Sequence, residues 1–131
     1  MNRRDHLAAL LAMATTLLPA GKLRALEARM EELVPHYGLI GQMLAQPGQR
    51  AALAAILSEG TGAMPGNIAY LVGEDSANPD AIWVVELWDS REAHAASLNL
   101  PAVQAAIQRA RPMIAGFGQR VEFKPVTSAR P

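Results

Sequence analysis

Ile82-Trp-Val-Val-Glu-Leu-Trp88 carries the strongest β-strand signal in the chain, because β-branched and aromatic residues dominate it. Side chains of a strand alternate between two faces, so Glu86 is the only charge on a face that also holds Ile82, Val84 and Trp88. The opposite face, from Trp83 to Leu87, is entirely apolar. Both faces of this strand therefore need cover from other parts of the fold.

Patterns on either side of this strand predict its partners. Tyr37 to Gln46 is apolar on both faces over most of its length, which predicts a covered strand that ends at Pro47-Gly48. Gly66 to Glu74 and Asp80 to Asp89 are extended runs joined by the turn-forming cluster Asp75-Ser-Ala-Asn-Pro79. These two runs are predicted to form a hairpin.

Two helices are predicted between these strands and after them. The alanine-rich stretch from Pro47 to Gly60 has apolar residues on one side, which is typical of a helix that packs on a sheet. Asp89 or Ser90 can serve as the N-cap of a second, short helix that ends near Leu98. Glu92 stands at capping-box spacing from Asp89.

A further helix and a last strand complete the pattern. Pro101 opens the helix and Pro112 ends or kinks it. Gly116 and Gly118 are predicted to supply the turn into the strand. From Arg120 to Lys124 apolar and charged residues alternate, which predicts a half-buried strand whose charged face is in water.

The predicted element order is β-α-β-β-α-β, the split βαβ order of the ferredoxin-like α+β fold. In that fold helices cover one face of a four-stranded antiparallel sheet and the other face is left bare. Because the first and third strands are apolar on both sides, the bare face is apolar as well. A second copy of the sheet is the simplest cover, so we expect a homodimer in which two sheets meet.

Composition excludes several classes of function. The chain has 131 residues with 12 basic and 12 acidic side chains, which fits one small domain without net charge. A nucleic-acid surface needs a basic patch and usually aromatic platforms, and this chain has neither a basic run nor many aromatic residues. The absence of cysteine excludes disulfides and thiolate chemistry. The three histidines, His6, His36 and His94, are far apart in sequence, and we expect no metal site.

Residues 1–36 precede the predicted domain, and two interpretations of them stay open. Arg3-Arg4, the weakly hydrophobic stretch Leu7 to Leu18 and the break Pro19-Ala-Gly21 resemble a twin-arginine export signal, which implies the periplasm. Alternatively, leucines at helical spacing as far as Leu33 form an amphipathic arm for a partner subunit in a cytoplasmic protein. Neither interpretation implies stable membrane insertion. Residues 37–126 form the domain and 127–131 a C-terminal tail.

Five motifs in this domain together resemble the antibiotic biosynthesis monooxygenase family, in its quinol monooxygenase branch. The likeness covers about 90 residues, from Tyr37 to Val126. The motifs are Met64-Pro-Gly66, Asn78-Pro-Asp-Ala-Ile-Trp83, Glu86-Leu-Trp-Asp-Ser-Arg-Glu-Ala-His-Ala-Ala-Ser-Leu98, Leu100-Pro-Ala-Val103 and Arg109-Ala-Arg-Pro-Met-Ile-Ala-Gly-Phe117.

The resemblance implies a dimeric α+β barrel with one pocket per subunit between sheet and helices. It also implies oxidation of hydroquinones or polycyclic phenols by dioxygen without a cofactor, although the fold hosts haem-degrading oxygenases and isomerases too. Haem-degrading relatives use a histidine where this chain has only Val103 to Ile107, so haem ligation is disfavoured. Many quinol-type relatives have a histidine at the position of Ser97, and here His94 lies about one helical turn earlier.

Glu86 and His94 are the candidate catalytic bases. A carboxylate desolvated beside tryptophan has a raised pKa, and histidine titrates near neutrality, so either could take a phenolic proton. In the alternative interpretation, Glu86 forms a structural ion pair with Arg91, Arg109 or Arg111. His94 would then be a partly buried residue bonded to a backbone carbonyl.

The remaining candidates are substrate-binding residues. Trp88 is predicted to form an aromatic wall on which a flat substrate stacks, and Tyr70 to donate a hydrogen bond to a substrate oxygen. Arginines are candidates to stabilise developing negative charge, and methionines to form an adaptable apolar lining. The apolar candidates are equally ordinary core residues. The full set is Trp88, Tyr70, Arg91, Ser97, Arg111, Met43, Met113 and Phe117.

These features favour a cofactor-independent monooxygenase that acts on a hydroquinone or polycyclic phenol with dioxygen. Two alternatives remain open: a non-catalytic dimer that binds a small hydrophobic ligand, and a cofactor-free isomerase of a small metabolite in which Glu86 is the base.

Overall fold

The computed structural model describes residues 19–32 and 34–126 of the chain. The chain divides into two compact units, Met1–Leu33 and Val34–Pro131. In the first unit, helix α2 spans Ala20–Glu32 and begins within the segment Pro19-Ala-Gly21. The twin-arginine-like stretch up to Leu18 lies outside the described residues. No helix within the described ranges is long and apolar enough to span a membrane.

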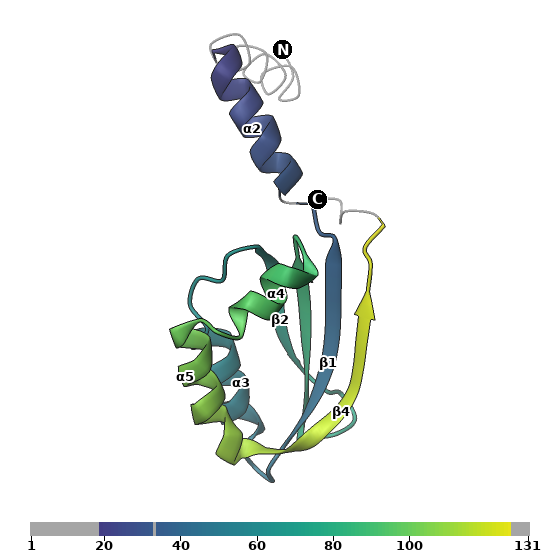
Figure 1. Ribbon diagram of the computed structural model, residues 1–131. Coiled ribbons are helices and arrows are strands. Elements are labelled where there is room, and N and C mark those ends of the chain that lie inside the picture. Colours follow the sequence, from purple (N-terminus) through teal and green to yellow (C-terminus); the bar gives the residue numbers. More distant parts are fainter. Residues whose placement is uncertain (1–18, 33, 127–131) are drawn as a thin grey trace, which may run out of the picture. The chain divides into compact units, whose positions relative to one another are not determined.

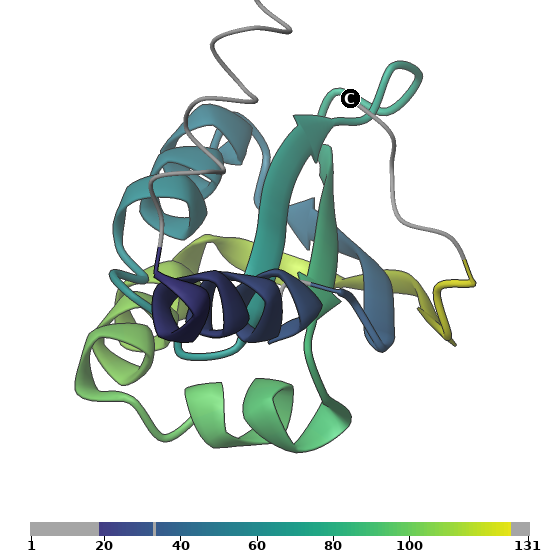
Figure 2. The ribbon, with the colours of Figure 1, turned by 90° about the horizontal axis from the view of Figure 1, so that it is seen from above.

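The second unit contains one four-stranded antiparallel sheet with the strand order β2-β3-β1-β4. This order and the sequence of elements confirm the α+β ferredoxin-like fold. Figures 1 and 2 show α3 and α5 side by side on one face of the sheet, and Figure 1 places α4 on that same face. The elements are β1 (Tyr37–Ala45), α3 (Arg50–Glu59), β2 (Asn67–Glu74), β3 (Ala81–Trp88), α4 (Arg91–Ser97), α5 (Pro101–Ala110), the 3₁₀ turn η1 (Arg111–Met113) and β4 (Ile114–Phe123).

The helix-facing side of the sheet, called the inner face below, carries the core. A first cluster joins strand residues to α3 and α5, with Leu53 and Ile82 fully buried at its centre. A second cluster consists of Tyr37, Leu39 and Trp88 at the other end of the sheet. The inner face thus has an apolar contact region at each end, and the two regions hold the helices in place.

The opposite side of the sheet, called the outer face, is covered by no helix of residues 34–126 (Figure 1). The strand register places Leu71, Val85, Ile40 and Val121 in one row across all four strands. Leu71 is 62% exposed and Val121 is 51% exposed. The predicted apolar character of the bare face is therefore confirmed.

Strand β4 differs from the prediction in two respects. It begins at Ile114, so Gly116 and Gly118 lie inside the strand and the predicted glycine turn is wrong. Its pairing with β1 shifts register at two places, and glycines inside strands commonly accompany such bulges.

The exposure of β4 also differs from the prediction, because Val121 on its apolar side, predicted to be buried, is 51% exposed. Cross-strand partners share a face, so the pair of Leu39 with Glu122 places this charged side chain on the inner face. Phe123, which is 37% exposed, is on the outer face with Val121. The charged side of β4 therefore lies on the inner face, where Arg120 lines a cavity and pairs with Glu122.

The start of α4 decides between the two predicted caps. The Ser90 side chain accepts a hydrogen bond from the backbone N–H of Ala93 at 3.0 Å, so Ser90 is the N-cap. Glu92 then stands at the second helical position, and the capping box with Asp89 is wrong. Gly66, with φ of +83°, lets the chain pass closely under this helix, because a Cβ there would lie 2.7 Å from that of Ala93.

Candidate active site

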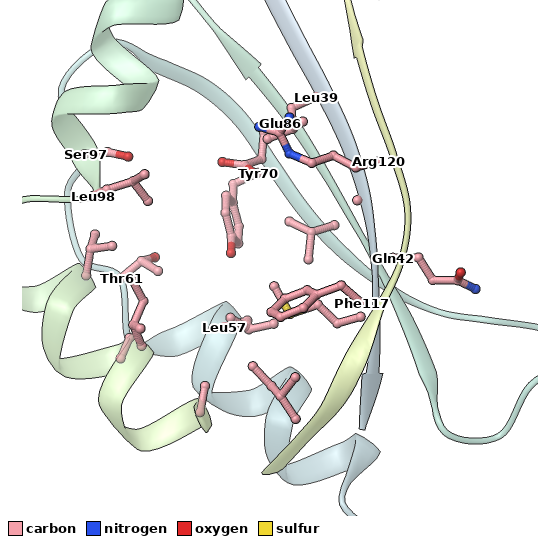
Figure 3. A pocket seen from close by; sticks show the side chains of 18 of the residues that line it. Leu39, Gln42, Leu57, Thr61, Tyr70, Glu86, Ser97, Leu98, Phe117 and Arg120 are labelled. Atoms are coloured by element: carbon pink, nitrogen blue, oxygen red, sulfur yellow. The ribbon is translucent and has the colours of Figure 1, made fainter. Parts of the chain in front are cut away.

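A cavity of about 770 Å³ lies between the inner face of the sheet and the helices (Figure 3). Its walls are mostly apolar, and the ionisable side chains of Glu86, His94 and Arg120 form a polar end. The strands supply Leu39, Gly41, Gln42, Met43, Tyr70, Val84, Glu86 and the segment Ile114–Arg120, and the helices and loops supply Leu57, Thr61, Met64, His94, Ser97, Leu98, Val103, Ala106, Ile107, Ala110 and Arg111.

Glu86 of β3 and His94 of α4 face each other at this polar end. Nε2 of His94 lies 4.0 Å from Oε1 of Glu86, and the two side chains are only 14% and 13% exposed. Glu86 is there because strand alternation turns it inward with Val84. His94 is there because the Ser90 cap fixes where α4 begins. Two segments that follow one another in sequence thus build an acid-base pair.

Two aromatic residues fix the geometry of this pair. The indole Nε1–H of Trp88 donates a hydrogen bond of 3.2 Å to Oε1 of Glu86. The Trp88 and His94 rings meet edge to face, with their centroids 5.4 Å apart. Tyr37 lies on another side of the imidazole, at 5.6 Å between ring centroids. The pair is therefore held against a rigid aromatic support.

Burial shifts the pKa values of the pair toward each other. Desolvation raises the pKa of Glu86, and the Trp88 hydrogen bond and the positive charge of Arg120 offset part of that increase. Desolvation lowers the pKa of His94, and Arg120 lowers it further. His94 is consequently neutral at pH 7 and able to accept a proton.

Tyr70 lies beside Glu86 on the neighbouring strand and points into the cavity (Figure 3). Burial and the nearby carboxylate raise the pKa of Tyr70 to about 12. Its hydroxyl therefore stays protonated at neutral pH and can donate a hydrogen bond to a ligand.

A charged cluster built on Glu122 borders the same end of the cavity. The Tyr37 hydroxyl donates a hydrogen bond of 2.8 Å to Oε1 of Glu122. Arg120 and Arg91 form ion pairs with Glu122 at 3.1 and 2.6 Å. These contacts, the Tyr37 hydrogen bond first, lower the pKa of the Glu122 carboxyl. Of the two arginines, Arg120 lines the cavity and Arg91 does not.

The structure brings seven of the ten predicted site residues to the cavity. They are Glu86, His94, Tyr70, Ser97, Arg111, Met43 and Phe117. Ser97 is buried, and its hydroxyl donates to the backbone carbonyl of His94 at 2.6 Å. Phe117 is 71% exposed at the β4 side, and its ring points into the cavity in Figure 3.

The other three predicted residues do not line the cavity. Trp88 is completely buried and lies behind Glu86 and His94, so the expected aromatic wall is instead a support. Arg91 is 67% exposed and pairs with Glu122. Met113 packs against the first core cluster. Tyr70 and Phe117 take the place expected for Trp88, because they are the aromatic side chains that reach the cavity space.

The structural alternatives for the two bases are also resolved within residues 34–126. Glu86 forms no ion pair with Arg91, Arg109 or Arg111, and the ionisable side chain that lies 4.0 Å from its carboxylate is the imidazole of His94. No backbone carbonyl of the described chain accepts a hydrogen bond from the His94 ring. Glu86 is therefore not held in an ion pair with one of these arginines, and the His94 ring is not held by a backbone carbonyl.

Sequence reasoning missed Arg120, Leu39, Thr61 and Leu98, all of which line the cavity. The signal for Arg120 is the alternation of β4, which predicts a water-exposed charged side but does not say on which face of the sheet that side lies. Gln42 also borders the cavity, but Figure 3 shows its side chain pointing away from the cavity. Within the described part of the chain, no three acidic or histidine side chains stand close enough to hold a metal ion.

Comparisons with known proteins agree with this architecture. Residues 36–109 match the family model described as antibiotic biosynthesis monooxygenase. A crystal structure from Chloroflexus aurantiacus J-10-fl, described as a candidate antibiotic biosynthesis monooxygenase, is 54% identical, with a TM-score of 0.69. The match covers 72% of this chain and 96% of that one. No curated protein sequence matches the chain significantly.

More distant structures share the fold alone. A protein from Deinococcus radiodurans, also described as a candidate member of this family, is 23% identical with a TM-score of 0.59, over 72% of this chain and 97% of that one. A protein from Bacteroides thetaiotaomicron, described as of unknown function and a possible oxidoreductase, is 18% identical with a TM-score of 0.60, over 69% of this chain and 97% of that one. The same scaffold therefore also occurs in proteins without an assigned reaction.

Proposed function

Because the chain belongs to the antibiotic biosynthesis monooxygenase family, we propose that it is a cofactor-independent monooxygenase that oxidises a hydroquinone or polycyclic phenol with dioxygen. The observation that carries this proposal is the buried pair of Glu86 and His94 at one end of an apolar cavity. The apolar body suits an aromatic ring, and the pair suits the removal of a phenolic proton.

The reaction balances without an external reductant. Loss of a proton converts the hydroquinone to an electron-rich anion, which passes one electron to dioxygen. The resulting radicals combine in a carbon–oxygen bond, and the peroxide loses water to leave a hydroxylated quinone. One hydroquinone and one dioxygen thus give one hydroxyquinone and one water, and the substrate supplies all the electrons. The protein needs to bind the ring, take the proton and exclude bulk water.

Each polar residue at the cavity end has a role in this scheme. Neutral His94 takes the phenolic proton, and the carboxylate of Glu86 at 4.0 Å stabilises the imidazolium that forms. Tyr70 donates a hydrogen bond to a substrate oxygen, while its ring and that of Phe117 bound the space for the aromatic system. Trp88 keeps Glu86 in place.

The proposed enzyme is a homodimer joined through the outer face. A row of apolar side chains crosses all four strands there, and its two ends, Leu71 and Val121, are exposed. Water contact with such a row is unfavourable, and monomeric proteins rarely present one without a partner. A second copy is a self-complementary cover for this face.

The deciding experiment is oxygen uptake by the purified protein with a panel of reduced quinones and anthrones, corrected for autoxidation. We expect uptake that saturates with substrate, and a fall of kcat/KM by about 10²-fold or more in His94→Gln. Glu86→Gln should lower kcat/KM less than His94→Gln does, because it removes the carboxylate that stabilises the imidazolium and leaves the base in place. Glu92→Gln, which removes an exposed carboxylate on the same helix, is the matched control.

The pH dependence separates the two candidate bases. With His94 as the base, kcat/KM rises with pH through a value below 6.5, because only the neutral imidazole accepts the proton. This rise should vanish in His94→Gln and persist in Glu86→Gln. Saturable binding without uptake by any substrate would instead support a non-catalytic binding protein.

A further inference from the structure

We propose that Arg120 is the residue that holds the anionic oxygen of an aromatic ligand in this cavity. The inference deepens the proposed function, since it assigns the group that stabilises the phenolate formed by proton transfer. It also defines a ligand class, namely an aromatic oxyanion whose charged end lies beside Glu86 and His94.

The position of Arg120 supports this assignment. It lines the cavity from β4, and Figure 3 shows its side chain extending toward Glu86. The register places Arg120 in one inner-face row with Gly41 and Val84. Because Gly41 has no side chain, nothing from β1 separates the guanidinium from the cavity in that row. Arg120 and Glu86 thus approach the same end of the cavity from two different strands.

The charges around Arg120 leave it free to bind an anion. Glu122 is shared between Arg120 and Arg91, so two guanidinium groups are balanced by one carboxylate. Only one nitrogen of Arg120, NH1, contacts Glu122, at 3.1 Å. A guanidinium has five N–H donors in a rigid fork, so others remain for a ligand oxygen.

Proton transfer from a phenol to His94 would leave a phenolate beside the Glu86 carboxylate, and a nearby cation would stabilise it. A phenolate formed beside Glu86 is repelled by that carboxylate, most strongly where both are shielded from water. Arg120 is close enough to this pair to affect both members, since its charge lowers the pKa of Glu86 and that of His94. The same charge favours the ionised form of a phenol placed between them.

Neither of the other candidate arginines meets these conditions. Arg91 binds Glu122 at 2.6 Å and does not line the cavity. Arg111 lines the cavity, but it belongs to η1 beyond the end of α5 and not to the strands that carry Glu86. Glu122 is then a positioning residue, because its Oε1 contacts both Arg120 and the Tyr37 hydroxyl. Tyr37 in turn packs on the His94 ring.

The test uses 4-nitrophenol, whose phenolate absorbs visible light and which lacks a second hydroxyl for quinone formation. Spectroscopic titration of the full chain gives the dissociation constant of the phenolate and the pKa of the bound ligand. We expect binding to lower the ligand pKa. Arg120→Gln should weaken phenolate binding about tenfold or more, since a hydrogen bond to a charged group is lost. The affinity for 4-nitroanisole, which cannot ionise, should not change.

Arg91→Gln is the matched control, because it removes the same charge from the same carboxylate outside the cavity. It should bind the phenolate nearly as well as the wild-type protein. Equal losses in Arg91→Gln and Arg120→Gln, or no loss in Arg120→Gln, would overturn the assignment. Circular dichroism spectra of both variants establish that they fold.

The phenolate-binding measurement does not depend on whether the protein oxidises a substrate. If Arg120→Gln loses the phenolate while no substrate supports oxygen uptake, the anion site stands and the monooxygenase proposal fails. If oxygen uptake occurs and Arg120→Gln retains both phenolate binding and kcat/KM, the monooxygenase proposal stands and the anion site is refuted.

Discussion

Trp88 illustrates how a residue without ligand contact can control a site. It is completely buried, donates a hydrogen bond to Glu86 and packs edge to face on His94. A hydrogen bond to a carboxylate stabilises the charged form, so this contact keeps the pKa of Glu86 lower than burial alone would set it. Trp88 does not reach the cavity, so the aromatic rings available to stack on a ligand are those of Tyr70 and Phe117.

Trp88→Phe is therefore predicted to raise the pKa of Glu86, because the hydrogen bond to its charged form is lost. The loss of free energy of unfolding should stay below the roughly 3–5 kcal/mol that truncation of such a ring to alanine costs. NMR titration of the glutamate carboxyl carbons measures the first effect, and urea denaturation the second. Trp83→Phe is the control, since Trp83 donates to Asp75 and faces away from the pair. An unchanged Glu86 titration would refute the supporting role.

Gly41 offers a second test at the residue scale. It lines the cavity, its φ is not positive, and an added Cβ would meet no atom within 4 Å. Gly41→Leu should therefore fold normally and fill part of the cavity. We expect affinity for aromatic ligands to fall by an order of magnitude or more, with no loss of thermal stability. Binding titrations and thermal denaturation check this, and a leucine variant that binds ligands normally would show that they bind elsewhere.

The hairpin between β2 and β3 is the element on which the position of Glu86 depends, and Asp75 holds its turn. Oδ1 of Asp75 accepts hydrogen bonds of 2.8 Å from the backbone N–H groups of Ala77 and Asn78, and Oδ2 accepts one of 2.8 Å from Trp83. These bonds, that from the Asn78 N–H first, lower the pKa of Asp75 to about 2. The turn is thus stabilised by an ionised carboxylate.

This element should lose stability in acid. A carboxyl with a lowered pKa in the folded state contributes stability above its ordinary value of 3.8, and the contribution disappears as the pH falls to about 2. Asp75→Asn should lower the urea midpoint at pH 6, and the difference from the wild-type protein should shrink between about pH 4 and pH 2. Glu92→Gln controls for the loss of a negative charge. A constant difference at every pH would contradict the prediction.

Strand β4 shows that an alternating pattern specifies two faces but not their direction. Its charged side chains, Arg120 and Glu122, pair with each other on the inner face, where Glu122 also accepts a hydrogen bond from Tyr37. Val121 and Phe123 on the other side then extend the apolar outer face. Which side of β4 faces the helices depends on its register with β1, where Leu39 lies opposite Glu122.

At the scale of the whole molecule, the outer face tests the proposed dimer. Leu71→Lys combined with Val121→Lys places charges at both ends of the apolar row, where burial in an interface is costly. We expect light scattering to report a dimer for the wild-type protein and a monomer for the double variant. Ala105→Lys, on an exposed position of α5, should stay dimeric. A wild-type monomer at micromolar concentration would refute the proposal.

The sequence by itself determined the element order, the apolar outer face and the face of β3 that Glu86 shares with Trp88, because these follow from local periodicity along single strands and helices. It also identified the family, because the motifs that resemble the family are short stretches of consecutive residues. The tertiary structure alone decided that Trp88 is a support and that Arg120 and Glu122 lie on the inner face of the sheet, with Arg120 lining the cavity. These features depend on strand register and on which groups meet across the fold, and neither can be read from the spacing of residues along the chain.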